Sequence, residues 1–168
     1  MKLFIKTCLI LFAVFFIGCH DINTVSSQTI LQGSVEKVPD GFFGSWNVVS
    51  KLIETDSPAT FKQKGIDIWN LYTEHDVIIL CNPFSGARAK ISISNAGKTF
   101  IQFSKTGKYE DRKLTDKVSI NIQGDSFTGV DEIKLETFSD IDGSLIKTQT
   151  AKYVIKGERI SGQDIIVK

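Results

Sequence analysis

The side chains best suited to covalent or acid–base chemistry are scarce in this sequence. After the first eighteen residues it contains two cysteines, Cys19 and Cys81, and two histidines, His20 and His75. Cys81 and His75 lie six residues apart, which on an extended strand is roughly 20 Å. A thiol and an imidazole at that distance cannot share a proton unless the chain bends back. We therefore interpret Cys81 as a small buried apolar residue.

Motifs for metals, phosphate groups and nucleic acids are also missing. The sequence has no Cys-x-x-Cys or His-Glu-x-x-His spacing and no glycine-rich phosphate loop. Asp140-Ile141-Asp142-Gly143 resembles part of a calcium loop, but the later ligands are absent and Asp142-Gly143 is typical of a hairpin turn. Basic and acidic residues number 20 and 19, whereas nucleic-acid binding needs clustered positive charge. We predict no enzyme activity, no metal or other cofactor and no nucleic-acid partner.

Residues 1–18 have the organisation of an export signal. Lys2 and Lys6 make the start basic, and an apolar run follows from Leu9 to Ile17. This run is shorter than the about 20 residues that a membrane-spanning helix needs, but it suits the apolar region of a signal peptide. Because the two lysines leave with the signal, the mature chain keeps 18 of the 20 basic residues and all 19 acidic ones, a formal net charge of −1.

Phe16-Ile17-Gly18-Cys19 resembles the lipobox of bacterial lipoproteins, although leucine is usual where Phe16 stands. The resemblance implies a thioether-linked diacylglycerol on Cys19, cleavage between Gly18 and Cys19, and a membrane anchor of fatty acyl chains such as palmitate. Two or three chains anchor a protein durably, since each buried methylene contributes about 0.8 kcal/mol. His20, not Asp, follows Cys19, and in this the chain resembles lipoproteins that are sent to the outer membrane where a cell has one. The alternative is an ordinary secretory signal, or an uncleaved anchor, in which Cys19 is incidental.

The remaining chain divides into a tether and one domain. Residues 19–40 are predicted to be the lipidated N-terminus and a polar tether, which as a flexible coil reaches roughly 25 Å. Residues 41–168 are predicted to form a single β domain.

Apolar and polar residues alternate throughout the predicted β domain. Val118, Ile120 and Ile122, for example, oppose Ser119 and its polar neighbours. This period of two residues is typical of antiparallel strands with one buried face. Turn signals separate the segments at short and regular intervals, which favours a barrel or sandwich. We predict a short turn or helix at 57–64 and strands at 44–53, 66–73, 76–81, 87–94, 98–104, 114–123, 126–138, 144–156 and 159–166.

Gly44-Ser45-Trp46 opens the first predicted strand and resembles the Gly-x-Trp signature of lipocalins and the wider calycin group. Over residues 41–163 the resemblance implies an all-β, antiparallel meander closed into a barrel of about eight to nine strands. It also implies that Trp46 plugs one end beneath a basic side chain of the last strand, a place that Arg159 suits. The chain departs from the family in lacking a Thr-Asp-Tyr motif and a C-terminal helix. A β-sandwich is the alternative fold, with Trp46 an ordinary core residue.

Small closed barrels either enclose one ligand or fill with side chains. We predict a membrane-anchored lipoprotein of the cell envelope, on its periplasmic or surface face, that binds a small hydrophobic ligand in its barrel. The alternative is a structural or interaction lipoprotein with a filled barrel that acts on an envelope protein or glycan. Asn82-Pro83-Phe84-Ser85-Gly86 is interpreted as a tight turn that folds its aromatic over the barrel mouth, or as a gating or partner-binding loop. Five phenylalanines are candidates to line or fill the interior: Phe61, Phe100, Phe103, Phe127 and Phe138.

Overall fold

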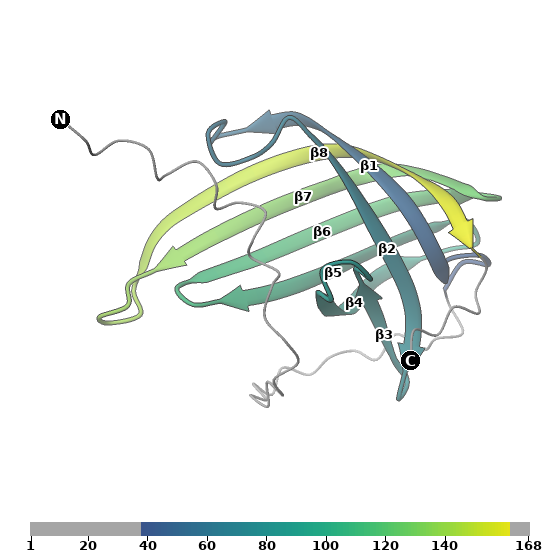
Figure 1. Ribbon diagram of the computed structural model, residues 1–168, viewed down its shortest axis with the longest axis horizontal. Coiled ribbons are helices and arrows are strands. Elements are labelled where there is room, and N and C mark those ends of the chain that lie inside the picture. Colours follow the sequence, from purple (N-terminus) through teal and green to yellow (C-terminus); the bar gives the residue numbers. More distant parts are fainter. Residues whose placement is uncertain (1–37, 162–168) are drawn as a thin grey trace.

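A computed structural model describes residues 38–161, which form a closed antiparallel β-barrel (Figure 1). Each strand pairs with the next along the chain, and the last pairs with the first. The predicted barrel is therefore confirmed, and the alternative sandwich is not observed. The strands are β1 (Gly44–Thr55), β2 (Lys64–Glu74), β3 (Val77–Cys81), β4 (Arg88–Ala96), β5 (Phe100–Tyr109), β6 (Arg112–Gln123), β7 (Ser126–Phe138) and β8 (Leu145–Ser161).

The predicted signal peptide, the lipobox with Cys19 and most of the predicted tether lie outside the described residues, as do residues 162–168. Within the described part of the chain, no helix is long and apolar enough to cross a membrane. At 57–64, where a short turn or helix was predicted, the structure has turns, in which the N–H groups of Thr60 and Phe61 donate to the carbonyl of Ser57.

We predicted two separate last strands, at 144–156 and 159–166. The predicted break between them is wrong, because one strand, β8, covers both up to Ser161, the last residue that the structure describes. β8 runs without interruption through Gly157, which lies between the two predicted strands. Gly157 pairs with Phe127 of β7, and the Phe127 ring occupies the space that a Cβ at Gly157 would need. The glycine therefore permits close packing inside the barrel instead of a turn.

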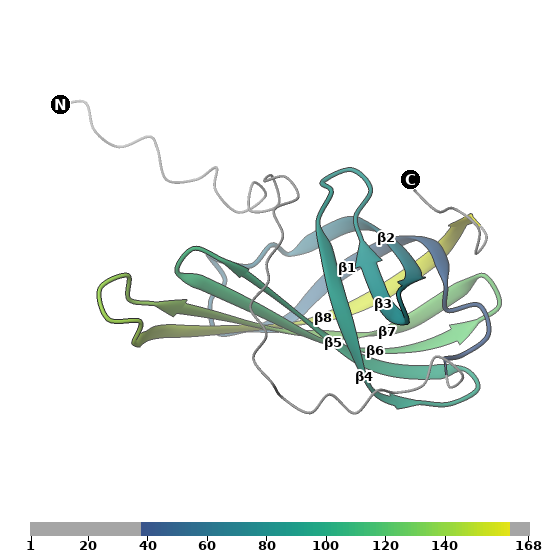
Figure 2. The same cartoon turned by 90° about the horizontal axis from the view of Figure 1, so that it is seen from below.

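The barrel is uneven along its length. The β5–β6 and β7–β8 hairpins extend beyond the shorter strands β3 and β4, and β2 to β4 close the barrel across from β6 and β7 (Figures 1 and 2). The first strand enters, and the last strand leaves, at the other end. We call the end at which β1 begins and β8 ends the compact end. The opposite end, to which the β5–β6 and β7–β8 hairpins extend, is the broad end.

Aromatic side chains fill the compact end. Trp46 is fully buried, with its ring edge-on to Phe127 at 5.1 Å between centroids, and Phe127 stacks on Trp69 at 5.9 Å. The Trp46 indole N–H donates to the carbonyl of Phe42 at 3.1 Å, which satisfies its polar group inside the core. Among the five candidate phenylalanines, Phe61, Phe103 and Phe127 are buried, whereas Phe100 and Phe138 are half-buried.

Candidate ligand-binding site

Arg159 seals the compact end of the barrel. Its guanidinium carbon lies 4.2 Å from the centroid of the Trp46 ring, a cation–π contact. Nη1 donates to the carbonyl of Phe43 at 2.8 Å, Nη2 donates to that of Gly41, and Nε donates to Asp125 at 2.9 Å. Every nitrogen of the group is thus engaged, and the N-terminal segment is held against the last strand.

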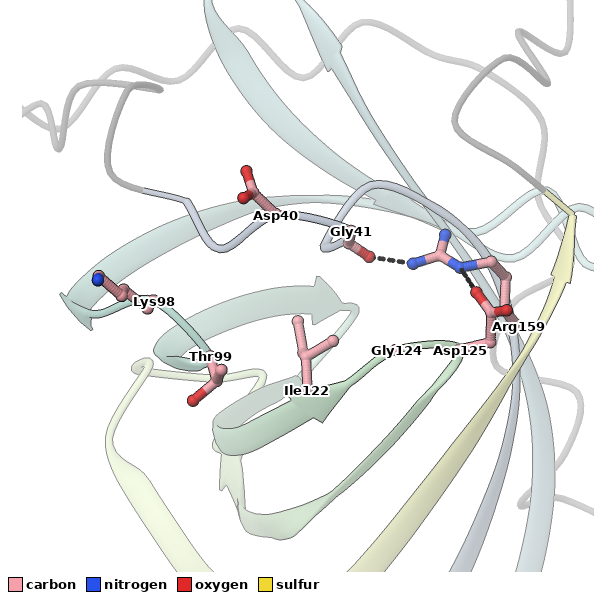
Figure 3. Close-up of a pocket in the computed structure, with 8 residues that line it drawn as sticks. All are labelled: Asp40, Gly41, Lys98, Thr99, Ile122, Gly124, Asp125 and Arg159. Carbon is pink, nitrogen blue, oxygen red and sulfur yellow. Dashed lines mark hydrogen bonds and ion pairs between the residues drawn. The ribbon is translucent and has the colours of Figure 1, made fainter.

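A shallow hollow of about 600 Å³ lies outside this end, between the N-terminal segment and the β4–β5 and β6–β7 turns. Figure 3 shows Arg159 turned towards Gly41 and Asp125, with Lys98 on the far side and Ile122 between them. Of the buried polar atoms in the described residues that lack a hydrogen-bond partner, none lines the hollow. We interpret the hollow as the outer surface of a structural seal.

The barrel interior holds a second cavity, of about 370 Å³. It begins at Trp69 and opens at the broad end, where the loops after β1 and β3 contribute to its lining. The cavity wall is mixed, with polar and charged side chains among apolar ones. The apolar part of the lining includes Val48, Phe61, Trp69, Leu80, Leu114 and Ile155.

Four polar side chains from adjacent strands form one wall of this cavity, and we call them the polar arc: Lys105 (β5), Asp116 (β6), Asp131 (β7) and Tyr153 (β8). Lys105 faces Asp116 across the β5–β6 ladder, and its ammonium forms an ion pair with Asp116 Oδ2. Asp131 faces Tyr153 across the β7–β8 ladder. The Tyr153 hydroxyl donates to the carbonyl of Lys62 at 3.0 Å, so the phenol does not use its proton on Asp131.

The two carboxylates of the polar arc are buried and incompletely paired. Asp116 is 3% exposed and Asp131 is 8% exposed. Within residues 38–161, neither the Oδ1 of Asp116 nor the Oδ1 of Asp131 has a hydrogen-bond partner. A buried acceptor without a donor carries a desolvation cost of about 1–3 kcal/mol, and more when it is charged. Two such atoms on one cavity wall indicate a place for a donor from outside the chain.

Burial also sets the protonation of the polar arc. It raises the pKa of Asp131 to about 6; the nearby Lys105 opposes this rise and Glu132 adds to it. Burial lowers the pKa of Lys105, against the attraction of Asp131 and Asp67. Counted by formal charge, as two carboxylates and one ammonium, the polar arc carries a net charge of −1.

The loop after β3 is fastened at the cavity mouth by Asn82. Its amide nitrogen donates to Asp67, whose other oxygen accepts from the Trp69 indole at 3.1 Å. Its amide oxygen accepts from the N–H groups of Phe84 and Ser85 at 2.8 and 3.0 Å. The Phe84 side chain is not folded over the mouth, as one interpretation had it, but is 82% exposed.

Cys81 and His75, which the sequence analysis considered as a thiol–imidazole pair, lie at opposite ends of β3. His75 lies in the turn before β3, with a φ of 47°, and Cys81 is the last residue of β3. Cys81 is half-buried, so its interpretation as a buried residue needs correction. In the part of the chain that the structure covers, no three His, Cys, Asp or Glu side chains are grouped to hold a metal ion.

Sequence reasoning missed the polar arc, although the alternation carried a signal for it. Asp116 stands two residues before Val118, and Asp131 stands two before Ile133. Lys105 likewise stands two residues after Phe103. Extending each buried face by one step places all three charged residues inside the barrel.

The chain has no match among protein-family models, curated proteins or solved structures.

Proposed function

We propose that this protein is a lipid-anchored binding protein of the bacterial envelope that holds one small, partly apolar molecule inside its barrel. The observation that carries the proposal is the interior cavity of about 370 Å³, which has one sealed and one open end. Ligand pockets commonly measure about 300–1,000 Å³. At about 30 Å³ per water molecule, the space holds roughly a dozen waters, which a small ligand would replace.

The open end gives the ligand its route. Arg159 and Trp46 close the other end, so exchange takes place past the loops after β1 and β3. Apolar side chains on the cavity wall favour burial of hydrocarbon, at about 25 cal/mol per Å² removed from water. The anchor is inferred from the residue pattern that ends at Cys19, and it would hold this binding domain beside a membrane.

Native mass spectrometry of the purified full chain tests this function, before and after addition of octanol. We expect a one-to-one adduct, either carried from the cell or formed with octanol. The variant Gly107→Phe should remove it, because Gly107 lines the cavity and has open space around it that the ring would fill. Gly97→Phe is the matched control, since Gly97 also has open space but lies in the turn before β5. A chain that never carries or takes up an apolar molecule would eliminate the proposed function.

A second candidate function is contact with another envelope protein through the broad end. Two large apolar side chains protrude there, Phe84 in the loop after β3 and Ile141 in the β7–β8 hairpin, which are 82% and 92% exposed. Exposed apolar groups of this kind favour association. Crosslinking in cells should then recover one partner with the native chain and lose it with Phe84→Ser and Ile141→Ser together. Recovery of the chain alone counts against this role.

A further inference from the structure

The unpaired acceptors of the polar arc restrict which molecules the cavity suits. Asp116 gives one oxygen to Lys105, and the remaining oxygen has no donor in the described part of the chain. Asp131 also has an oxygen without a donor, and it lies two strands from Lys105. A ligand group that donates hydrogen bonds would satisfy atoms that the protein itself leaves unsatisfied.

The sign of the charge narrows the choice further. A carboxylate or phosphate ligand at the polar arc would lie beside two aspartates, while the ammonium of the arc is already paired with Asp116. The other cationic side chains of the lining, Lys62, Lys64 and Arg88, are exposed and do not belong to the arc. A divalent metal ion would lie beside the Lys105 ammonium with only two carboxylates to bind it. A single positive charge, in contrast, would neutralise the net −1 of the polar arc with charge-assisted hydrogen bonds.

The opposite wall of the cavity indicates the chemistry of the remaining part of the ligand. Trp69 and Leu80 come from β2 and β3, which lie across the barrel from β6 and β7. They offer apolar surface to whatever occupies the space in front of the carboxylates. The suitable molecule therefore has a cationic donor at one side and a hydrocarbon part at the other.

We infer that the natural ligand is a small amphipathic amine, whose ammonium group binds between Asp116 and Asp131 and whose apolar part packs against Trp69. This inference rests on the proposed function and names the chemical class of its ligand. Asp131 is the residue that determines the preference for a cation, because Asp116 is already engaged with Lys105.

Three probes of equal chain length test this inference: octylamine, octanol and octanoate. The full chain is reconstituted in nanodiscs of zwitterionic lipid at pH 8, and binding is followed by tryptophan fluorescence, to which Trp69 on the cavity wall contributes. Each probe also partitions into lipid, so affinities are compared between variants for the same probe, and the partitioning then cancels. Asp131→Asn removes the charge at the site. Glu132→Gln removes the same charge from the next residue, which is exposed and paired with Lys152.

We expect Asp131→Asn to weaken octylamine binding by about tenfold or more, the effect of losing one charged hydrogen bond, and to change octanol binding by less than about twofold. Glu132→Gln should leave the affinities of all three probes unchanged. Equal losses in both variants, or a loss of octanoate binding in Asp131→Asn as large as the loss of octylamine binding, would overturn the amine assignment while the proposed function stands. Failure of all three probes to bind would overturn the proposed function and this inference with it.

Discussion

Replacing Asp131 by asparagine is expected to stabilise the protein at neutral pH and to have little effect in acid. Asparagine has the shape of a protonated aspartate and carries no charge. In the folded protein Asp131 is 8% exposed, and burial raises its pKa to about 6 from an ordinary value of 3.8. In the unfolded chain the same carboxyl is in water and titrates near that ordinary value.

The sign and size of the effect follow from the two pKa values. Between about pH 4 and pH 6 the folded protein holds a proton on Asp131 that the unfolded chain has released. The free energy of unfolding therefore decreases as the pH rises through this window, and the stabilisation present below pH 4 is lost above pH 6. At about 1.4 kcal/mol per pKa unit, the loss amounts to about 3 kcal/mol. The asparagine variant does not lose this free energy, because its amide does not titrate in this range.

Urea unfolding followed by tryptophan fluorescence, from pH 4 to pH 8, measures this difference. The free-energy difference between Asp131→Asn and the native chain should grow by about 3 kcal/mol between the two ends of the range. Carboxyls with lowered pKa, such as those of Asp56 and Glu136, titrate in both proteins and cancel in the difference. Glu132→Gln should show no comparable gain. A difference that stays constant with pH, or a variant less stable than the native chain at pH 8, would refute the reasoning.

Three further outcomes are expected. Gly157→Ala should lower the free energy of unfolding by about 3 kcal/mol, because the added methyl overlaps the Phe127 ring; Gly107→Ala, in open space, should stay within about 0.5 kcal/mol, and equal effects would contradict the packing argument. Arg159→Lys should lose about 2 kcal/mol, seen as a lower melting temperature, since lysine cannot keep all three hydrogen bonds; an unchanged melting temperature would contradict the seal. Cys19→Ser should abolish acylation in intact-mass analysis and release the chain from membranes, and fatty acid retained on this variant would rule out the anchor.

The fold could be predicted from the sequence because a closed meander depends on local signals. The alternation of apolar and polar residues shows which face of each strand is buried, and the turn at Asp142-Gly143 follows from its residue types. The break predicted between residues 156 and 159 is wrong because glycine, here Gly157, is suited both to turns and to close contacts. The Phe127 ring that requires a glycine there lies 30 residues earlier and meets it only through the pairing of β7 with β8.

The candidate site was harder to predict, because charged residues ordinarily mark the wet face of a strand. Glu132 and Asp131 are adjacent acidic residues of β7, yet the first is exposed and the second is buried. Alternation along β7 places Asp131 on the same face as Ile133 and Glu132 on the other face. Whether the face of Asp131 is buried at that point depends on the neighbouring strands. The match of Lys105 with Asp116 likewise depends on the register of β5 with β6, which no local pattern states.

The polar arc is better explained by a ligand than by stability alone. Two carboxylates around one ammonium destabilise the folded barrel, since buried charges with incomplete partners cost more than apolar side chains in the same space. Apolar residues fit the neighbouring inward positions, as Leu114 and Ile133 show. A purely structural role for Asp131 requires that Asp131→Asn lower stability and ligand affinity together. A role in binding requires opposite signs, a more stable protein that binds an amine less tightly, and the two measurements on one variant decide between the roles.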